Sequence, residues 1–127
     1  MDSIQTAAVK KRSFELNYNG GTIWCEHIDG MGTYEDMVIE KYLGDRSRFS
    51  RPSVSSFMII DLDDTDITER IVSAITETIL ESKVFRKIAF VGVRPYWQRK
   101  IGVIGQKGIA VCFVDDYEKA REWLIRE

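Results

Sequence analysis

The feature that most constrains the fold of this chain is an unbroken apolar run, FMIIDL, at residues 57–62. Because successive side chains of a strand point to opposite faces of a sheet, a strand with one solvated face alternates between apolar and polar residues. This run does not alternate, which is typical of a strand buried on both faces of a parallel sheet. Acidic residues and threonines follow directly (DDTDIT, 63–68), and a helical pattern begins there. We therefore expect residues 57–62 to form a central strand.

Two shorter segments before this run predict an antiparallel pair of strands. Residues 13–18 alternate between apolar and polar side chains, and residues 22–28 form the returning strand. Asn19-Gly20 between them favours a tight hairpin, because both residues tolerate a positive φ. Residues 1–12 end in a basic KKR triplet and predict a short tail, which leaves residues 13–127 as the domain.

The remainder of the chain switches repeatedly between helical and strand patterns. Apolar residues three and four apart predict helices, whereas short apolar runs predict buried strands. We expect the first helix to begin at a Thr33 cap and end at Gly44, and the last to begin at a capping pair, Asp115 with Glu118. The expected helices are 33–43, 66 or 68–82, 95–105 and 115 onward, with strands at 87–93 and 109–114 and a loop at 45–56.

The order β-β-α-β-α-β-α-β-α predicts the fold class. Strands joined by a tight turn are antiparallel, whereas strands linked by helices are most simply parallel through right-handed crossovers. We expect an α/β fold with a single mixed, mostly parallel sheet of about five strands.

Composition restricts the class of protein. A chain of 127 residues is one domain that buries roughly two thirds of its unfolded surface. Its net charge of −2 gives no general attraction to nucleic acid, and no apolar run approaches the ~18 residues of a membrane span. The N-terminus lacks the pattern of a secretion signal. Cys25 and Cys112, without a CxxC neighbour, predict reduced thiols in a cytoplasmic protein.

The acidic strand end has one enzymatic interpretation. The sequence DLDDT at 61–65 fits the DxDxT signature of haloacid-dehalogenase-type phosphatases, in which Asp61 would attack phosphorus and Asp63 would act as general acid and base, with Mg²⁺ neutralising charge. Asp115 and Asp116 resemble the metal-binding acids of that family. However, a helix follows the loop at once instead of a flap, and the next strand, FVGV at 90–93, ends without the family's hydroxyl residue.

The whole pattern resembles the STAS domain more closely, particularly the STAS-like, anti-sigma-factor-antagonist-like proteins of bacteria. The resemblance extends from Phe14 to the C-terminus and consists of strand and helix ends. The matching segments are IWCEHIDG (23–30), MIIDL (58–62), KIAFVGV (87–93) and VCFVDDYEKAREWL (111–124).

The resemblance implies a non-catalytic regulatory module that docks on a partner protein and needs no cofactor. In regulatory members a hydroxyl at the start of the helix after the central strand is phosphorylated, which adds charge where the partner packs. This chain lacks the Asp-Ser-Ser-Gly-like segment, and its own acids could imitate a phosphorylated state. The candidates for partner binding or phosphoryl acceptance are Asp63, Asp64, Thr65, Thr68 and Glu69. The alternative is structural: Asp and Thr at a helix start are worth ~1 kcal/mol as caps.

Three cations around the next predicted helix are candidates for anion binding: Arg94, Arg99 and Lys100. A small apolar ligand is a further alternative, in a cradle formed by Met31, Tyr34, Met37, Tyr96 and Trp97. These aromatic and methionine side chains could equally fill the core.

Two further patterns predict no site. His27, the single histidine, stands beside acids and is expected to be a half-buried hydrogen-bonding residue, because no second histidine or nearby thiolate completes a zinc site. Gly102, Gly105 and Gly108 lack the context of a dinucleotide fingerprint. Partner identity stays open, and homodimerisation is compatible with the sequence.

Overall fold

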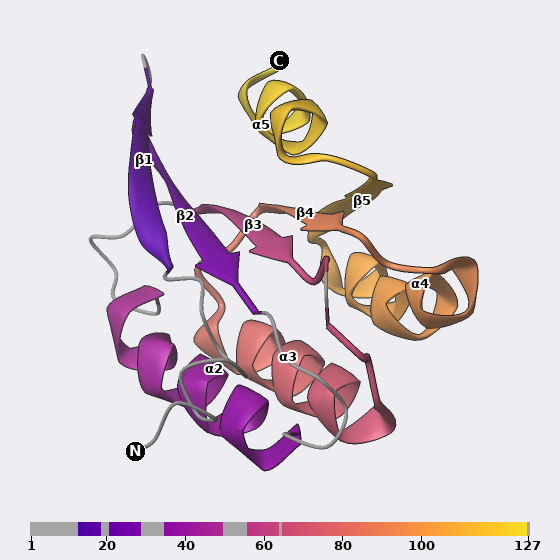
Figure 1. Ribbon diagram of the computed structural model, residues 1–127. Helices are drawn as coiled ribbons and strands as arrows, with labels where there is room; N and C mark the ends of the chain where they lie inside the picture. Colours follow the sequence, from indigo (N-terminus) through magenta and orange to yellow (C-terminus); the bar gives the residue numbers. More distant parts are fainter. Residues whose placement is uncertain (1–12, 19–20, 29–34, 50–55, 64, 127) are drawn as a thin grey trace.

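The computed structural model (Figure 1) describes residues 13–18, 21–28, 35–49, 56–63 and 65–126. The predicted N-terminal tail, the Asn19-Gly20 turn and the Thr33 cap lie outside these residues. Among the described residues, no helix combines the length and apolar character required to cross a bilayer.

Five strands of the described part of the chain form one mixed sheet, and their order in the sheet is their order in the chain. The first two strands are antiparallel, and every later strand pairs in parallel with the one before it. The strands are β1 (Phe14–Tyr18), β2 (Gly21–His27), β3 (Phe57–Asp61), β4 (Lys87–Val91) and β5 (Ala110–Val114). The α/β fold class, the mixed sheet and the hairpin pairing predicted from the sequence are confirmed.

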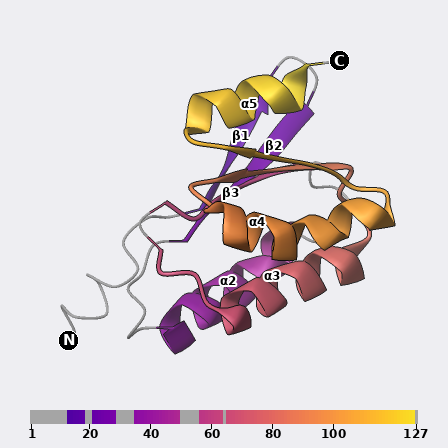
Figure 2. The same ribbon diagram turned by 90° about the vertical axis from the view of Figure 1, so that its right-hand side faces the viewer.

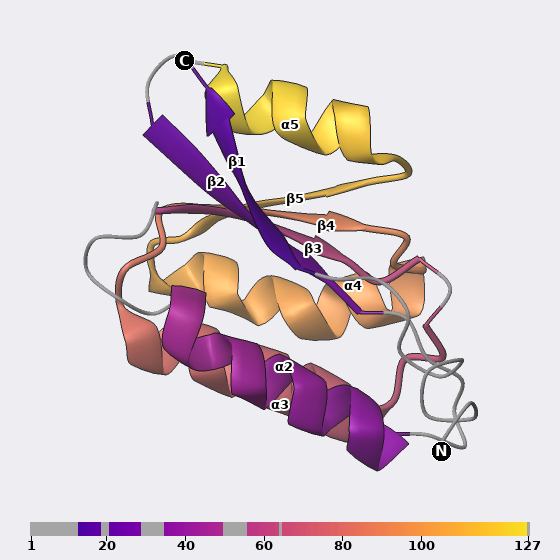
Figure 3. The ribbon, with the colours of Figure 1, turned by 60° about the vertical axis from the view of Figure 1, so that its left-hand side comes forward.

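The helices cover the sheet unequally. Of the elements that the structure describes, one group of helices with a short 3₁₀ segment covers one face, and one helix covers the other (Figures 1, 2 and 3). The first group is α2 (Glu35–Phe49), α3 (Glu69–Ser82), α4 (Pro95–Ile101) and the 3₁₀ helix η2 (Gly102–Lys107), and the helix on the other face is α5 (Tyr117–Ile125).

Alternate side chains of β3 supply both hydrophobic cores. Met58 and Ile60 join the larger core beneath α2, α3 and α4, whereas Ile59 joins the smaller core beneath α5. All three side chains are fully buried. The unbroken apolar run therefore lies between two layers of helix, as the sequence predicts.

The C-terminal limit of α2 differs from the prediction. We expected the helix to end at Gly44, but it continues to Phe49. A helical glycine costs roughly 0.5–1 kcal/mol relative to alanine. Contacts of the two residues after Gly44 offset that cost, because Asp45 pairs with Lys41 one turn earlier and Arg46 pairs with Glu81 of α3.

Three other limits also differ. Strand β4 ends at Val91 because Gly92 adopts a φ of 79°, which turns the chain out of the sheet. The single helix expected at 95–105 is an α-helix followed by a 3₁₀ segment. The cap of α5 is Asp116, which accepts the N–H of Lys119, so the capping position lies one residue beyond the predicted Asp115.

Candidate functional site

The acidic segment begins at the carboxyl end of β3, where Asp61 is anchored on both oxygens. Its Oδ1 accepts the backbone N–H of Asp63 at 3.0 Å, and its Oδ2 lies 3.1 Å from Nδ1 of His27. Only 8% of the Asp61 surface is exposed. The carboxylate therefore shapes the start of the loop instead of projecting into solvent.

His27 is the half-buried hydrogen-bonding residue that the sequence predicts, but its partner comes from another strand. In the parallel register of β2 and β3, His27 lies directly opposite Asp61. The ring of Phe14 stacks on the imidazole with 5.4 Å between ring centroids. Nothing in the sequence reveals this pair, because it depends on the relative register of two strands more than 30 residues apart.

The two threonines of the loop use their hydroxyl groups internally. Thr65 donates its hydroxyl to the carbonyl oxygen of Ile28. Thr68 is the N-cap of α3: it accepts the N–H of Ile71 at 3.2 Å and donates its own proton to the carboxylate of Glu35. The predicted capping role of Thr68 is thus confirmed, and both hydroxyls help to fix the loop.

The acidic side chains that the structure describes in this loop are exposed to solvent. Asp63 and Asp66 are exposed, and Asp64 lies outside the described residues. Glu69, on the first turn of α3, is also exposed and pairs with Lys100 of α4 at 2.9 Å. We refer to the exposed carboxylates of residues 63–69 as the acidic loop surface.

The three cations predicted to bind anions do not act as one group. Lys100 is neutralised by Glu69 and lies over the ring of Tyr96. Arg99 is exposed on α4. Arg94 is exposed at the start of α4 and makes no ion pair or side-chain hydrogen bond with any described residue. Pro95 follows it and has no N–H to offer an anion.

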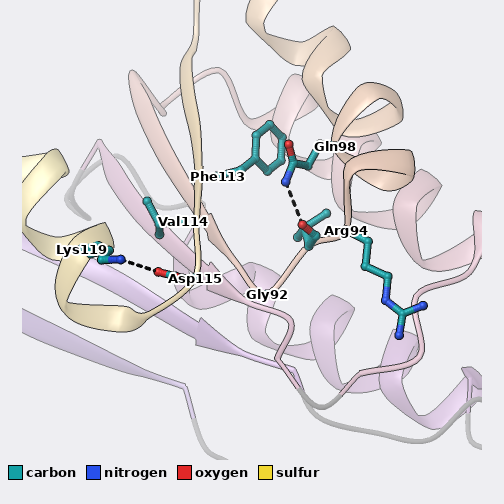
Figure 4. Close-up of a pocket in the computed structure, with 8 residues that line it drawn as sticks. Gly92, Arg94, Gln98, Phe113, Val114, Asp115 and Lys119 are labelled. Atoms are coloured by element: carbon teal, nitrogen blue, oxygen red, sulfur yellow. Dashed lines mark hydrogen bonds and ion pairs between the residues drawn. The ribbon is translucent and has the colours of Figure 1, made fainter.

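A crevice lies beside Arg94, where the chain after β4 and the chain after β5 diverge. Strand β4 leads to α4 on one face of the sheet and β5 leads to α5 on the other, so the two segments separate beyond the carboxyl ends of the strands, where open α/β sheets bind ligands. Figure 4 shows the larger hollow, of about 460 Å³, whose lining includes Arg94, Gln98, Phe113, Asp115 and Lys119. A second hollow of about 320 Å³ shares Gly92 and Arg94 with it.

The floor of this crevice depends on Gly92. A Cβ atom at this position would lie 2.8 Å from the backbone of Asp63, and the φ of 79° already disfavours any side chain. The turn after β4 can therefore pack directly on the acidic loop. Asp115 pairs with Lys119 at 2.9 Å, and Gln98 donates to the carbonyl oxygen of Val93. Some polar groups of the crevice wall are therefore already paired with one another.

A second polar cluster, which the sequence does not predict, is buried between β2 and α2. Glu26 is completely buried, and its Oε1 accepts the indole N–H of Trp24 at 2.8 Å. Lys41 reaches it from α2 with Nζ 3.5 Å from Oε2. Burial, followed by a hydrogen bond with Asp45, raises the pKa of Glu26 from 4.5 to about 8. An acid directly after the apolar run IWC of β2 was the available signal.

The residues of the proposed apolar cradle are divided among different environments. Met31 and Tyr34 lie outside the described residues, and Met37 is half-buried. Trp97 packs against the larger core, as a core residue would, while Tyr96 is 52% exposed and meets it edge-on. The described part of this set does not enclose a cavity of its own.

Comparison with known proteins identifies the fold. No known family profile and no curated protein sequence matches the chain. The chain is similar to the crystal structure of an uncharacterized protein from the DUF3478 family, with a SpoIIAA-like fold, from Shewanella loihica PV-4. The TM-score is 0.52 at 16% identity, over 89% of this chain and 92% of that chain. The present chain has a SpoIIAA-like fold. This is the STAS-like architecture implied by the sequence resemblance, which is therefore confirmed at the level of the fold.

Within the SpoIIAA-like fold, the acids of the phosphatase hypothesis are dispersed. Asp61 is engaged on both oxygens, Asp63 is exposed, and Asp115 is bound to Lys119 on the far side of β4. The described residues include no group of three or more histidine, cysteine or acidic side chains placed to share a metal ion.

Proposed function

We propose that this SpoIIAA-like domain is a non-catalytic interaction module that docks a basic surface of a partner protein on its acidic loop surface. The observation that carries the proposal is a difference between the hydroxyl and the carboxylate side chains of residues 63–69. The hydroxyls of Thr65 and Thr68 bond to the domain itself, whereas the carboxylate of Asp63 is exposed.

The described residues of this segment are suited to docking because hydrogen bonds within the domain hold them. Asp61 accepts the N–H of Asp63, Thr65 donates to the carbonyl oxygen of Ile28, and Thr68 caps α3. A preorganised loop loses little conformational entropy on binding. Exposed carboxylates also steer a basic partner toward the correct face.

The same bonds argue against a phosphorylation switch at the threonines. Modification of Thr65 would remove its bond to the Ile28 carbonyl oxygen, and modification of Thr68 would place a phosphate beside Glu35. Like-charge repulsion would then oppose the modified state. We infer that the loop docks constitutively.

A charge-reversal pair tests the docking proposal. The tagged domain is incubated with lysate of the organism that encodes it, and bound proteins are quantified by mass spectrometry. We expect Asp63→Lys to lose the specifically bound proteins, because Asp63 is exposed on the loop. Glu77→Lys makes the same change of charge on an exposed part of α3 beyond its first turns and should retain them. Equal capture by both variants would refute the proposal.

The phosphatase alternative is tested directly with an aryl phosphate and Mg²⁺, comparing the natural chain with Asp61→Asn. Turnover that depends on Asp61 would replace the docking proposal with a catalytic one.

We further infer residence in the reducing cytosol, since Cys25 and Cys112 are both free thiols on strands that are not neighbours. Sedimentation analysis would show whether a second copy of the chain is among the partners.

A further inference from the structure

A third hollow lies at the opposite end of the parallel strands, away from the acidic loop surface. It has a volume of about 580 Å³ and is formed where α3 ends and where η2 leads into β5. This volume is within the ~300–1,000 Å³ range of small-molecule sites. Its lining consists of four apolar side chains, Ile79, Leu80, Phe85 and Ile109, with Lys83 and Lys107 and the backbone of Gly108.

The floor of the hollow belongs to the larger hydrophobic core. Ile79, Phe85 and Ile109 are members of that core and are 0%, 6% and 9% exposed. Leu80 is only partly buried and packs against the same core. A ligand in the hollow would therefore extend the core outward, and each apolar atom that it brings would leave water.

The charge of the hollow is one-sided. Lys83 and Lys107 are exposed and make no ion pair or side-chain hydrogen bond with a described residue. Among the described residues that line the hollow none is acidic, whereas each of the two hollows beside Arg94 includes an aspartate. Glu81, close by in sequence, is already paired with Arg46 at 2.6 Å. Two cations thus face an apolar floor without a counter-charge from the described residues.

The backbone keeps one of these lysines in an uncommon conformation. Lys83 is the C-cap of α3 and has a φ of 58°, in the left-handed region. Glycine or asparagine is the usual residue at such a position, because a side chain there is strained. A cation near the end of α3 also offsets the negative end of the helix dipole, which is the structural explanation that a test must separate from ligand binding.

We propose that this hollow binds a small amphiphilic anion, with a carboxylate or phosphate headgroup at Lys83 and Lys107 and a short apolar tail on Leu80 and Phe85. The proposal concerns a different surface from the acidic loop and does not depend on the docking function. The headgroup supplies the missing counter-charge, and the tail covers the apolar floor.

Calorimetric titration of the whole chain tests the proposal with defined probes. Decanoate and decyl phosphate, below their micellar concentrations, should bind saturably, whereas inorganic phosphate should not. Shortening decanoate to octanoate removes two methylenes and should weaken binding roughly tenfold if both are buried. Anionic vesicles form a separate arm, which distinguishes a free amphiphile from a lipid surface.

Variants locate the site. The Lys83→Ala/Lys107→Ala variant should weaken decanoate binding at least tenfold, while Arg99→Ala, which removes an exposed cation outside the hollow, should leave it unchanged. Binding should also shift the NMR signals of the Ile79 and Ile109 methyl groups more than that of Ile59, which lies in the other core.

Three results would overturn the proposal. No saturable binding of either amphiphile would remove the ligand altogether. Equal affinity of decanoate for the natural chain and for the Lys83→Ala/Lys107→Ala variant would show that the lysines do not bind the headgroup. Lys83 would then only offset the dipole at the end of α3. Binding to vesicles without binding to free decanoate would assign the lysines to a lipid surface instead.

Discussion

Deprotonation of the buried Glu26 carboxyl should lower the free energy of unfolding as the pH rises through neutrality. Burial raises the pKa of this group from 4.5 to about 8, and a hydrogen bond with Asp45 adds to the rise. Lys41 opposes the rise only in part, because its Nζ lies 3.1 Å from Asp45 Oδ2 and 3.5 Å from Glu26 Oε2. The contribution of Glu26 is therefore fully present below pH 4.5 and is lost as the pH rises to about 8.

The size of the effect follows from proton linkage. One pKa unit corresponds to about 1.36 kcal/mol, so the interval of about 3.5 units between the ordinary and the folded pKa sets an upper limit of about 5 kcal/mol. Water that enters beside a newly charged carboxylate, and movement of Lys41 toward it, would recover part of this loss. We expect a measured change of about 2–4 kcal/mol.

The Glu26→Gln variant isolates this contribution. Glutamine is neutral at every pH and keeps an oxygen that can accept the Trp24 indole N–H. Urea unfolding followed by circular dichroism at pH 5.5, 7 and 9 gives the free energy of unfolding for both chains. The free energies of unfolding of the natural chain and of the variant should differ by no more than about 1 kcal/mol at pH 5.5. At pH 9 the variant should be more stable by about 2–4 kcal/mol.

An exposed acid on α2 supplies the control. Glu40→Gln removes one carboxylate from the surface of the same helix and should not change the pH dependence. If the difference between the natural chain and Glu26→Gln is constant from pH 5.5 to 9, Glu26 is either ionised throughout or hydrated. Such a result would refute the argument from burial.

The remaining predictions concern stability and reactivity. In urea unfolding, Gly92→Ala should destabilise the domain by about 2 kcal/mol or more, because the new Cβ would overlap the backbone of Asp63. Gly44→Ala should instead stabilise the domain by about 0.5–1 kcal/mol, because no atom lies within 4 Å of the new Cβ. Thr68→Ala should cost about 1 kcal/mol through the lost cap, measured in the same assay. Cys25, whose pKa is raised to about 11 by burial, should react with a thiol reagent at pH 8 only after denaturant is added. Fast reaction of Cys25 in the folded chain would contradict its burial.

Local sequence patterns were sufficient to predict the type and order of the elements. The non-alternating run at 57–62 identified a strand buried on both faces. The capping role of Thr68 could be predicted because a threonine side chain can accept a free N–H at the start of a helix in any fold. Where local signals compete, the prediction failed: Gly44 signals a helix end, but Asp45 and Arg46 beyond it make contacts that extend α2.

The pairs that give the domain its chemistry required the tertiary structure. His27 meets Asp61 only because β2 and β3 pair in one particular register, and Glu26 is buried only because α2 packs over it. The hollow at Lys83 and Lys107 unites the ends of two helical segments more than 20 residues apart. The sequence determined the strands, the helices and their connections through local periodicity and capping, whereas contacts between distant segments decided which polar groups are buried, paired or left exposed.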